Sequence, residues 1–520
     1  MTAPLADLAA SVGFTLPGTY NASRLLWDNL ARNADRPAVI HDDGTLSYAD
    51  LAALAARYGD RLRQTCAPGD RVLMVMDDEP AYPAAIMGAM RAGLVPMLIN
   101  TLSPPDLMRF FLEDSGATAA VIGRGFAAQF DTALTENTAC RETLIADLPM
   151  TGPAPDLPEH PTTRRDMAFW MYSSGSTGRP KGVVHKHEDA AYTAATWSAD
   201  VLKLTPDSIC FSVPKIYFAY GFGNSVTFPM AAGAASVLLT GRPDPARVYD
   251  AIARHRPTHF FGLPTLYTAL ARHPAADTAD LSSVRLCLSA AEILSADIAG
   301  AWRDRFGLEI VEGLGSTEML HIYLSNRPGA TRQGSAGQAV PGYDIRLVTP
   351  EGTPAAAGED GVMQVAGLSG AEYYWNRPDK TAETMQDGWL HTGDRFSMDE
   401  DGYYFFKGRA DDLVKVSGQW VYPMEIELAL NEHPEVQESC VLAITLDDQR
   451  VTIAAVVAPA AGTTPGPELA RRLQDFAKAQ LLPHKYPRDI RFLDTLPKTG
   501  TDKIDRQALR RLVQPPEDAT

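Results

Sequence analysis

The sequence predicts an α/β protein with two domains, a large one over residues 1–410 and a small mobile α+β one over residues 411–520. The first observation is that short apolar runs alternate with segments of helical periodicity, which indicates doubly wound, mixed or parallel sheets covered on both faces. The second observation is a change of character after 408-GRADD-412. The third is the length of 520 residues, which exceeds the usual size of one domain.

The alternation begins with three short apolar runs that read as buried strands: RVLMVM (71–76), LVPMLIN (94–100) and TAAVIG (118–123). Between them, AYPAAIMGAMRAG (81–93) and PDLMRFFLEDSGA (105–117) have helical spacing. MAFWMY (167–172) is a further buried strand. The order of these segments predicts strands joined by helical crossovers.

The same pattern resumes later in the large domain. Strands are expected at 208–214, 258–264, 284–290 and 308–315, with helices at 245–257 and near 296–306. In such sheets, ligands bind beyond the carboxyl ends of the strands. VAGLSG, WLHTGD and YYFFKGR then predict a small β-rich portion before residue 410.

After Asp411, where we place the domain boundary, helical and strand patterns form a compact α+β unit. MEIELALNEHPEV, PELARRLQDFAKAQL and RQALRRLV are expected helices, and SCVLAIT, VTIAAVVAP and IRFLDTLP are expected strands. A segment of this length is a reasonable small domain.

Composition excludes several classes of partner. The chain carries 47 basic and 64 acidic residues, a net charge of -17, which repels nucleic acid and anionic membranes. Its five scattered cysteines form no CxxC pair and signal neither a zinc site nor a disulfide framework. No apolar run approaches the ~20 residues of a membrane span, and the N-terminus lacks the features of a signal peptide. We therefore expect a cytoplasmic protein with no membrane partner.

The stretch 172-YSSGSTGRPKG-182 follows a predicted strand and combines glycines, hydroxyls and a closing lysine. Glycines let backbone N–H groups approach anionic oxygens, and Ser and Thr add donors. The spacing differs from the Walker GxxxxGK[ST] pattern, because Gly182 follows Lys181. We interpret the stretch as a phosphate-binding loop of another kind.

Four more segments carry polar residues suited to a nucleotide. In 313-GLGSTEML-320, Glu318 is a hard carboxylate of the kind that binds Mg²⁺ together with substrate phosphates. Asp394 ends 389-WLHTGD-394, and Arg409 begins the segment 408–427; both suit ribose hydroxyls. Lys503 lies in 497-PKTGTDKIDR-506.

In this order, the five segments resemble the adenylate-forming superfamily of acyl-CoA synthetases, nonribosomal peptide synthetase adenylation domains and luciferases. YSSGSTGRPKGVVH, KIYFAYGFGN, GLGSTEMLHI and VSGQWVYPMEIE are most similar to benzoate-CoA ligases. The resemblance covers residues from about 20 to 510 and implies a chain that uses ATP, Mg²⁺ and coenzyme A to convert an aryl acid into its thioester through an acyl-AMP intermediate.

The resemblance also implies roles for individual residues. It places the β- and γ-phosphates at Ser173, Ser174, Gly175, Ser176, Thr177, Gly178 and Lys181. It places further nucleotide contacts at Ala291, Glu292, Glu312, Gly313, Gly315, Ser316, Asp394 and Arg409. Thr317 matches an α-phosphate contact, Glu318 the Mg²⁺ carboxylate, and Lys503 the catalytic lysine that bridges the acid and the α-phosphate.

The small domain is implied to rotate about a hinge at Asp411 after adenylation. That rotation would withdraw Lys503 and present Lys415, Ser417 and Gly418 to the CoA tunnel, where Gly418 would leave room for pantetheine. The resemblance allows a homodimer but does not require one.

The acid pocket implied by the resemblance is lined by Ala219, Tyr220, Gly221, Leu263, Ala290, His321 and Ile322. The chain departs from the benzoate-ligase pattern at Leu263 in GLPT, at Ala291 in SAAE and at Asp502 before Lys503. The first two are bulkier than the usual residues and would narrow the pocket. His321 is expected to be a structural hydrogen-bonding residue, because a carboxylate nucleophile needs no base.

Three alternatives remain beside the aryl-CoA ligase. The narrower pocket would suit a small heteroaromatic or short branched aliphatic acid. An adenylation enzyme could instead load a separate carrier protein, since no carrier domain follows within the 520 residues. A nucleotide sensor without chemistry is disfavoured by the full set of charged residues named above.

Overall fold

The computed structural model describes residues 3–135, 139–173, 179–292, 294–410, 414–416, 419–421, 423–445, 451–481, 485–498 and 504–513. The chain divides into two compact units. The first comprises Met1–Ile345, Gln364–His391 and Gly402–Tyr404, and the second comprises Arg346–Met363, Thr392–Asp401 and Phe405–Thr520. Asp411 lies outside the described residues, so the boundary between 410 and 411 stays a prediction.

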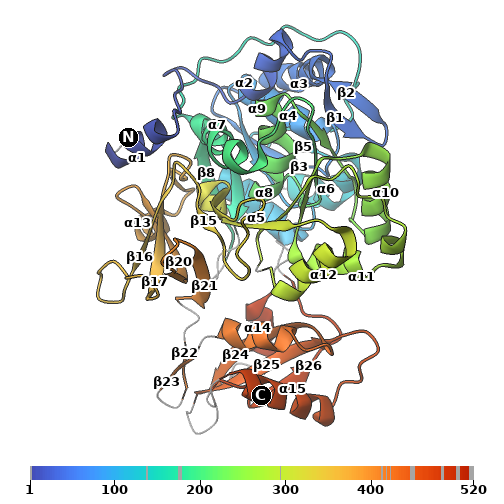
Figure 1. Cartoon of the computed structure of the whole chain (residues 1–520). Coiled ribbons are helices and arrows are strands. Elements are labelled where there is room, and N and C mark those ends of the chain that lie inside the picture. The colour runs from blue at the N-terminus through green and yellow to red at the C-terminus, as the bar shows by residue number, and fades with distance from the viewer. Residues whose placement is uncertain are drawn as a thin grey trace. The chain divides into compact units, whose positions relative to one another are not determined.

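A seven-stranded sheet lies in the first unit (Figure 1). Its order is β18 (Tyr373–Tyr374), β8 (Lys181–Lys186), β7 (Met167–Ser173), β4 (Val95–Leu98), β3 (Arg71–Val75), β5 (Ala119–Ile122) and β6 (Glu142–Ile145). The pairings from β7 to β6 are parallel, whereas β8 and β18 are antiparallel to their neighbours. Because both faces are covered, β3, β4 and β5 consist almost entirely of buried residues.

Helices precede or connect these strands. They are α3 (Tyr48–Arg63), α4 (Ala81–Arg91), α5 (Pro105–Ser115) and α6 (Ala127–Thr135), with the short η2 (Arg124–Phe126). The side chain of Ser47 caps α3 in a reciprocal capping box with Asp50. Gly116 ends α5 in the left-handed conformation, which favours glycine.

A nine-stranded sheet forms the rest of the core of the first unit. Its order is β15 (Gln338–Ala339), β14 (Ile322–Ser325), β13 (Ile310–Gly315), β12 (Leu286–Ser289), β11 (His259–Gly262), β9 (Ile209–Ser212), β10 (Ala235–Val237), β1 (Pro37–His41) and β2 (Gly44–Ser47). The pairings from β13 to β1 are parallel, so the carboxyl ends of those strands lie along one edge.

The helical segments of this part of the chain are α7 (His187–Thr193), η3 (Ala194–Leu202), α8 (Ala219–Phe222), η4 (Gly223–Thr227), α9 (Phe228–Ala232), α10 (Pro245–His255), α11 (Pro264–Arg272), η5 (Pro274–Asp277), α12 (Ala296–Phe306) and η6 (Thr317–Met319). Near the N-terminus lie α1 (Ala3–Ser11), α2 (Arg24–Trp27) and η1 (Asp28–Ala31). The segments η3 and η4 are π-helical, a conformation that is frequent at functional sites.

The β-rich portion is a five-stranded sheet in the order β16 (Asp344–Val348), β17 (Asp360–Ala366), β20 (Trp389–Met398) and β19 (Met385–Gln386), with β21 (Tyr404–Arg409) paired to β20. The helix α13 (Pro378–Thr384) precedes β19. The C-terminal segment has a hairpin of β22 (Val414–Val416) and β23 (Gln419–Val421). Beyond it lie α14 (Pro423–Asn431), β24 (Val436–Thr445), β25 (Val451–Pro459), α15 (Pro467–Gln480), β26 (Asp489–Phe492) and α16 (Arg506–Val513).

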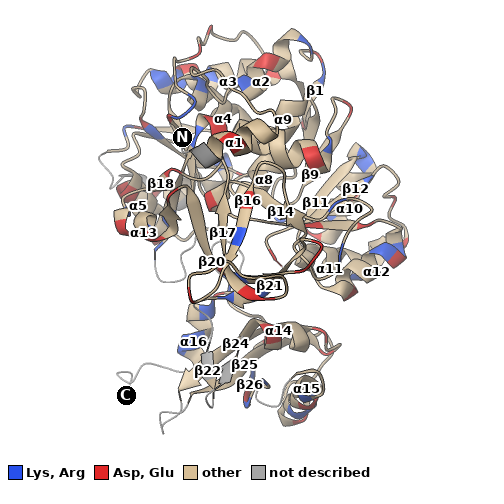
Figure 2. Ribbon diagram, turned by 60° about the vertical axis from the view of Figure 1, so that its left-hand side comes forward, with Lys and Arg blue, Asp and Glu red and all other residues tan. Residues whose placement is uncertain are grey.

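The predicted α/β class is confirmed, and each strand or helix expected between residues 71 and 315 forms close to its expected position. The strand β8 is not among the predicted strands, because it begins at Lys181, inside the stretch that we interpreted as a loop. In Figure 2, the ribbon positions of acidic residues are interspersed with those of basic residues, consistent with a surplus of negative charge that is spread along the chain. None of the five cysteines, all of which lie among the described residues, forms a disulfide bond. Among the described helices, none combines the length and apolar character needed to cross a bilayer.

Candidate active site

The carboxyl ends of three neighbouring parallel strands carry most of the predicted residues of the first unit. Gly262 of β11 pairs with Ser289 of β12, and Ser289 pairs with Glu312 of β13. The segments that follow these strands contain Leu263, Ala290 to Glu292, and Ser316 to Glu318. This edge is where a doubly wound sheet binds its ligand.

Glu318 is the point at which loops of the two large sheets meet. Its Oε1 accepts a hydrogen bond of 2.8 Å from the Tyr374 hydroxyl and one of 3.4 Å from Ser173 Oγ. Ser173 ends β7, and Lys181, its register partner on β8, places Nζ 4.3 Å from the centre of the Tyr374 ring. A carboxylate, a cation and the start of the glycine-rich loop therefore lie around one tyrosine.

The glycine-rich loop begins and ends at this cluster. Ser174, Gly175, Ser176, Thr177 and Gly178 lie outside the described residues. The two residues that bracket the loop, Ser173 and Lys181, are paired across β7 and β8, so both ends of the loop leave the sheet beside Glu318.

The backbone around Thr317 is anchored at several consecutive carbonyl groups. The carbonyl oxygen of Glu318 accepts from Ala371 N at 2.7 Å, and that of Met319 accepts from Ser369 Oγ at 2.9 Å. The carbonyl oxygen of Thr317 lies 2.8 Å from His185 Nε2. Ser316 caps the short helix η6 by accepting from Met319 N at 3.2 Å. The loop is thus held through its main chain, which leaves the side chain of Thr317 out of these contacts.

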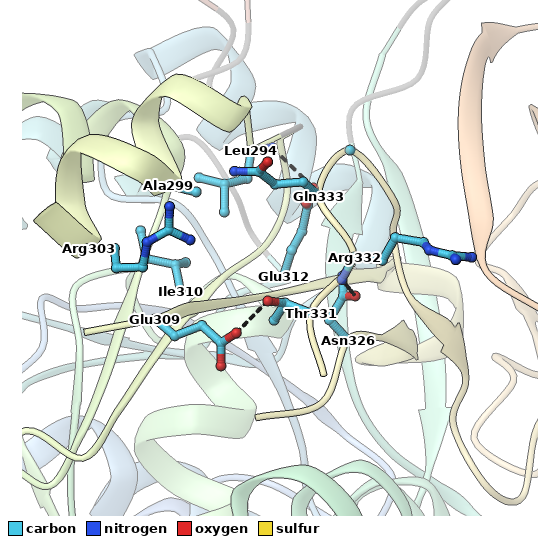
Figure 3. A pocket seen from close by; sticks show the side chains of 11 residues that line it. Leu294, Ala299, Arg303, Glu309, Ile310, Glu312, Asn326, Thr331, Arg332 and Gln333 are labelled. Atoms are coloured by element: carbon cyan, nitrogen blue, oxygen red, sulfur yellow. Dashed lines mark hydrogen bonds between the residues drawn. The ribbon is translucent and has the colours of Figure 1, made fainter. Parts of the chain in front are cut away.

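Glu312 braces the loop after β12. Its Oε1 accepts a hydrogen bond of 3.0 Å from Leu294 N, beside a cavity of about 40 Å³ (Figure 3). Burial raises the pKa of Glu312 to about 8, while the bond from Leu294 acts in the opposite direction. Glu312 is therefore largely protonated at neutral pH. Its position suits a supporting role for the predicted nucleotide loop.

Tyr220 and His321 lie together at the predicted acid pocket. Their rings are 5.5 Å apart, and His321 Nε2 lies 3.3 Å from the carbonyl oxygen of Tyr220. A carbonyl oxygen only accepts, so Nε2 carries the proton of the neutral ring. Burial lowers the pKa of His321 to about 3, and the ring is enclosed by Trp197 and Phe228. Its burial and neutrality fit the expected structural role.

At two positions of the predicted site, contacts within the protein leave no room for a side chain and so require glycine. A Cβ on Gly221 would stand 2.0 Å from the carbonyl oxygen of Lys215, and one on Gly315 would stand 2.4 Å from that of His321. Gly315 pairs with Ile322, the predicted pocket residue that begins β14. These glycines permit a close approach of two backbones, so their presence says little about direct contact with a ligand.

Leu263, Ala290 and Ala219 occupy separate segments at the same edge of the sheet. Leu263 is the residue before α11 and is half-buried, Ala290 is buried, and Ala219 begins α8. Gly313 of β13 lies against Ile322, since a Cβ there would stand 2.8 Å from its Cδ1. The predicted pocket residues therefore lie in α8, directly after β11 and β12, and at the start of β14.

In the second unit, Asp394 and Arg409 form a pair. Arg409 Nη1 donates to Asp394 Oδ1 at 3.1 Å and to the carbonyl oxygen of Thr392 at 3.2 Å. Gly393 has a φ of 73°, and a Cβ there would stand 3.0 Å from Arg409 Nη2. The pair joins β20 and β21 and places an acceptor and a donor side by side, as two ribose hydroxyls would require.

The remaining predicted residues belong to the C-terminal segment. Asp411, Ser417, Gly418, Asp502 and Lys503 lie outside the described residues. The backbone of Lys415 belongs to β22, where it pairs with Trp420. The hinge, the CoA tunnel and the catalytic lysine stay predictions.

Three residues near the site were not predicted. Tyr374 holds Glu318, His185 holds the Thr317 carbonyl, and Asn224 is a fully buried amide beside Tyr220. The only sequence signal for Asn224 was its place in the quoted stretch 215–224, and for His185 its place at the end of 172–185. No local pattern marked Tyr374, since its contact joins distant segments.

Comparison with known proteins assigns the family. Residues 26–375 match the model for the AMP-binding enzyme, and residues 425–503 match that for the AMP-binding enzyme C-terminal domain. The chain is 39% identical over 509 residues to benzoate–CoA ligase of Thauera aromatica, covering 95% of this chain and 96% of that protein. It is also 39% identical to 4-hydroxybenzoate–CoA/benzoate–CoA ligase of Rhodopseudomonas palustris, with 91% and 90% coverage.

Among solved structures, the anthranilate CoA ligase AuaEII in complex with anthranoyl-AMP matches with a TM-score of 0.89 and 34% identity, covering 96% of this chain and 98% of that one. The chain therefore belongs to the AMP-binding enzyme family, within the adenylate-forming superfamily. Within that family it is similar to the benzoate–CoA ligases, and the predicted membership is confirmed.

Ala291 stands where the backbone favours glycine, which generates a first prediction. Its φ is 71°, a conformation that costs a residue with a Cβ about 1–3 kcal/mol. We expect Ala291→Gly to raise the free energy of unfolding by about 1 kcal/mol, after the greater freedom of glycine in the unfolded chain is subtracted. Denaturant unfolding measures the change. The control Ala301→Gly, at an exposed position inside α12, should lower it by about 1 kcal/mol; equal losses in both variants would contradict the strain.

The raised pKa of Glu312 predicts how stability varies with pH. Because the folded pKa lies above the ordinary value of 4.5, the folded state binds this proton more tightly, and stability falls as pH rises between those values. Glu312→Gln keeps an acceptor for Leu294 N and removes that loss. We expect its unfolding free energy, relative to wild type, to increase from pH 5 to pH 8 by about 1 kcal/mol or more. The exposed control Glu351→Gln should show no such trend, and a flat difference for Glu312→Gln would contradict the assignment.

Proposed function

We propose that this chain is an AMP-forming ligase that joins an aromatic carboxylic acid to coenzyme A. In the first step, a carboxylate oxygen of the acid attacks the α-phosphorus of ATP, and pyrophosphate leaves. In the second step, the CoA sulfur attacks the acyl carbon, its thiol proton is lost, and AMP leaves. The cluster of Ser173, Lys181 and Glu318 around Tyr374 is the observation that carries the proposal, together with family membership.

The residues of the cluster suit the first step. Charge builds up on the phosphate oxygens during attack, and fixed cations and donors stabilise it. Lys181 supplies a cation at one end of the glycine-rich loop, and Ser173 supplies a hydroxyl at the other. Glu318 is a lone carboxylate of the kind that binds Mg²⁺ alongside substrate phosphates, where the ion would neutralise the triphosphate. Lys503 would approach the α-phosphate from the C-terminal segment.

The relatives support an aryl acid over the small aliphatic alternative. The similar ligases named above act, by their names, on benzoate, 4-hydroxybenzoate and anthranilate. The Tyr220 side chain is partly exposed and packs on His321, which Trp197 and Phe228 support from within the core, so the predicted pocket is bordered by an aromatic cluster that suits a ring. An enzyme that loads a separate carrier protein would use the same first step. The two functions therefore differ only in the molecule that accepts the acyl group.

Buried polar atoms beside Tyr220 favour an acid with a polar ring substituent. Tyr220 is partly exposed, but its hydroxyl is buried and, apart from the nearby Asn224 amide, has no hydrogen-bond partner among the described residues. The Asn224 side chain is fully buried, and its two polar atoms have no partner other than that hydroxyl within the described residues. A buried polar group without a partner costs about 1–3 kcal/mol. A hydroxyl or amino group on the bound acid would supply the partner.

Acid-dependent exchange between ATP and pyrophosphate tests this function. The panel is benzoate, its monohydroxy and monoamino isomers, and short branched aliphatic acids, followed by CoA consumption with each active acid. We expect at least one hydroxy- or aminobenzoate to exceed benzoate in kcat/KM by about tenfold or more, because a site built for a hydrogen bond rejects the analogue that lacks it. No exchange with any acid would refute the ligase, and exchange without a CoA thioester would favour a carrier protein.

The same panel distinguishes the role of the polar pair. Asn224→Leu and Tyr220→Phe should each reduce the preference for the substituted acid while keeping exchange with benzoate. Tyr249→Phe is the matched control, because it removes a buried hydroxyl that donates to the Leu270 carbonyl at 2.8 Å, within the segments α10 and α11. It should leave acid preference unchanged. Equal losses on every acid in the Asn224 and Tyr220 variants would contradict recognition of a substituent.

A further inference from the structure

A buried row of polar groups leads from α7 to the loop that carries Thr317. His185 Nδ1 lies 2.9 Å from Asp189 Oδ2, and His185 Nε2 lies 2.8 Å from the Thr317 carbonyl oxygen. The side chains of His185 and Asp189 are fully buried. The Phe169 ring stacks on the imidazole at 5.4 Å between centres, with an interplanar angle of 24°. The imidazole is therefore fixed in orientation on both its edges and on one face.

The local sequence explains why these groups meet. His185 lies on β8 opposite Phe169 of β7. The chain then turns directly into α7, whose N-cap residue Lys186 donates its backbone N–H to Asp189 Oδ2 at 3.0 Å. A carboxylate in the first turn of a helix is stabilised by the free N–H groups there. Because Asp189 follows His185 by four residues, the turn into α7 places its carboxylate beside Nδ1 of the imidazole.

Both neighbours of the imidazole carry acceptor oxygens. The Thr317 carbonyl oxygen only accepts, so Nε2 must donate to it. The Asp189 carboxylate lies at hydrogen-bonding distance from Nδ1 and holds the other edge of the ring. Lys186 Nζ, 3.7 Å from Asp189 Oδ1, adds a positive charge and is itself shared with Glu372 at 3.3 Å. The row therefore directs one donor, the Nε2–H group, at the Thr317 carbonyl.

The Nε2–H group of His185 binds the carbonyl group of Thr317, which is the first of three consecutive anchored carbonyl groups in this loop. The following carbonyl groups, of Glu318 and Met319, are held by Ala371 and Ser369, so their anchors come from residues 369–371. The Thr317 carbonyl accepts only two hydrogen bonds among the described residues, from Leu320 N within the turn and from His185. The His185 contact thus connects this turn to β8, the strand that begins at Lys181.

We propose that His185, oriented by Asp189, is a positioning residue for adenylation. It sets the Thr317 main chain, and through it the placement of the Thr317 hydroxyl and the Glu318 carboxylate relative to Lys181. The inference rests on the proposed function, since it assigns that turn to the ATP phosphates. His185 itself touches no substrate in this account.

Two substitutions at residue 185 separate its two hydrogen bonds. The amide nitrogen of glutamine reaches about as far as Nε2 of histidine, whereas that of asparagine reaches about as far as Nδ1. His185→Gln therefore keeps a donor for the Thr317 carbonyl and loses the bond to Asp189. His185→Asn keeps a donor for Asp189 and loses the bond to Thr317. Asp189→Asn is a third change: an amide nitrogen at the position of Oδ2 would donate to Nδ1 and leave Nε2 of a neutral imidazole donating to Thr317, but it would lose the hydrogen bond that Oδ2 accepts from the Lys186 N–H.

ATP–pyrophosphate exchange with the best acid of the panel gives the main readout. Asn at 185 should lower kcat about 10- to 100-fold with little change in KM for the acid, because a small misplacement of the reacting groups is costly. H185Q and D189N should stay within about threefold of wild type. Thermal unfolding of each variant, and calorimetric titration with AMP, provide measurements independent of turnover. We expect weaker AMP binding by H185N than by H185Q at similar thermal stability.

Wild-type exchange establishes the proposed function separately from this inference. If wild type is active and H185N and H185Q lose activity equally, in proportion to lost thermal stability, His185 is merely structural and the proposal is wrong. The proposal is equally wrong if H185N retains wild-type kcat and AMP affinity. Should H185N not fold, the decision rests on the other two variants: loss of exchange in folded H185Q or folded D189N contradicts the proposal, and retention in both supports it.

Discussion

The hydrogen bond from the Tyr374 hydroxyl to the Glu318 carboxylate joins the loops of the two large sheets. Tyr374 belongs to β18 at the edge of the seven-stranded sheet, and Glu318 follows β13 of the nine-stranded sheet. Bonds to a charged acceptor contribute about 1.5–3 kcal/mol and are directional. The Glu318 carboxylate is thereby directed toward Ser173, where β7 ends and the glycine-rich loop begins. Together with the contacts from Ser173 and His185, this bond brings the edges of the two sheets into one site.

The electrostatic attraction of a phosphate to this site comes from nearby charged groups and not from the net charge of the chain. The chain as a whole is strongly acidic, with a net charge of -17, so a triphosphate is not attracted by the overall field. Lys181 lies over the Tyr374 ring, and His185 with its partner Asp189 places a donor behind the Thr317 turn. The cations and donors nearest the predicted phosphate site are therefore attached to β8 or packed against it. This arrangement makes β8 the strand that positions Lys181 and His185 at the site.

The sequence predicts the strands and polar residues of this site better than it predicts the residues that contact them. Buried strands such as β3 and β12 are visible as apolar runs, and the polar residues after β13 follow from where ligands bind on such sheets. The partners of those residues were not visible. Tyr374 reaches Glu318 because β18 pairs with β8, a contact between residues nearly two hundred positions apart in the chain, and periodicity carries no information on which strands pair. The left-handed backbone of Ala291 and the two hydrogen-bonding contacts of His185 are likewise not visible in the periodicity of the sequence.

The central claim is that the acid itself attacks the α-phosphorus of ATP at the cluster around Glu318. Transfer of oxygen from the acid to AMP tests it most directly. With an active acid labelled with ¹⁸O in both carboxylate oxygens, plus ATP and CoA, mass spectrometry of the product AMP should find one labelled oxygen, because the acyl–oxygen bond breaks in the second step. Unlabelled AMP accompanying thioester formation would contradict the account.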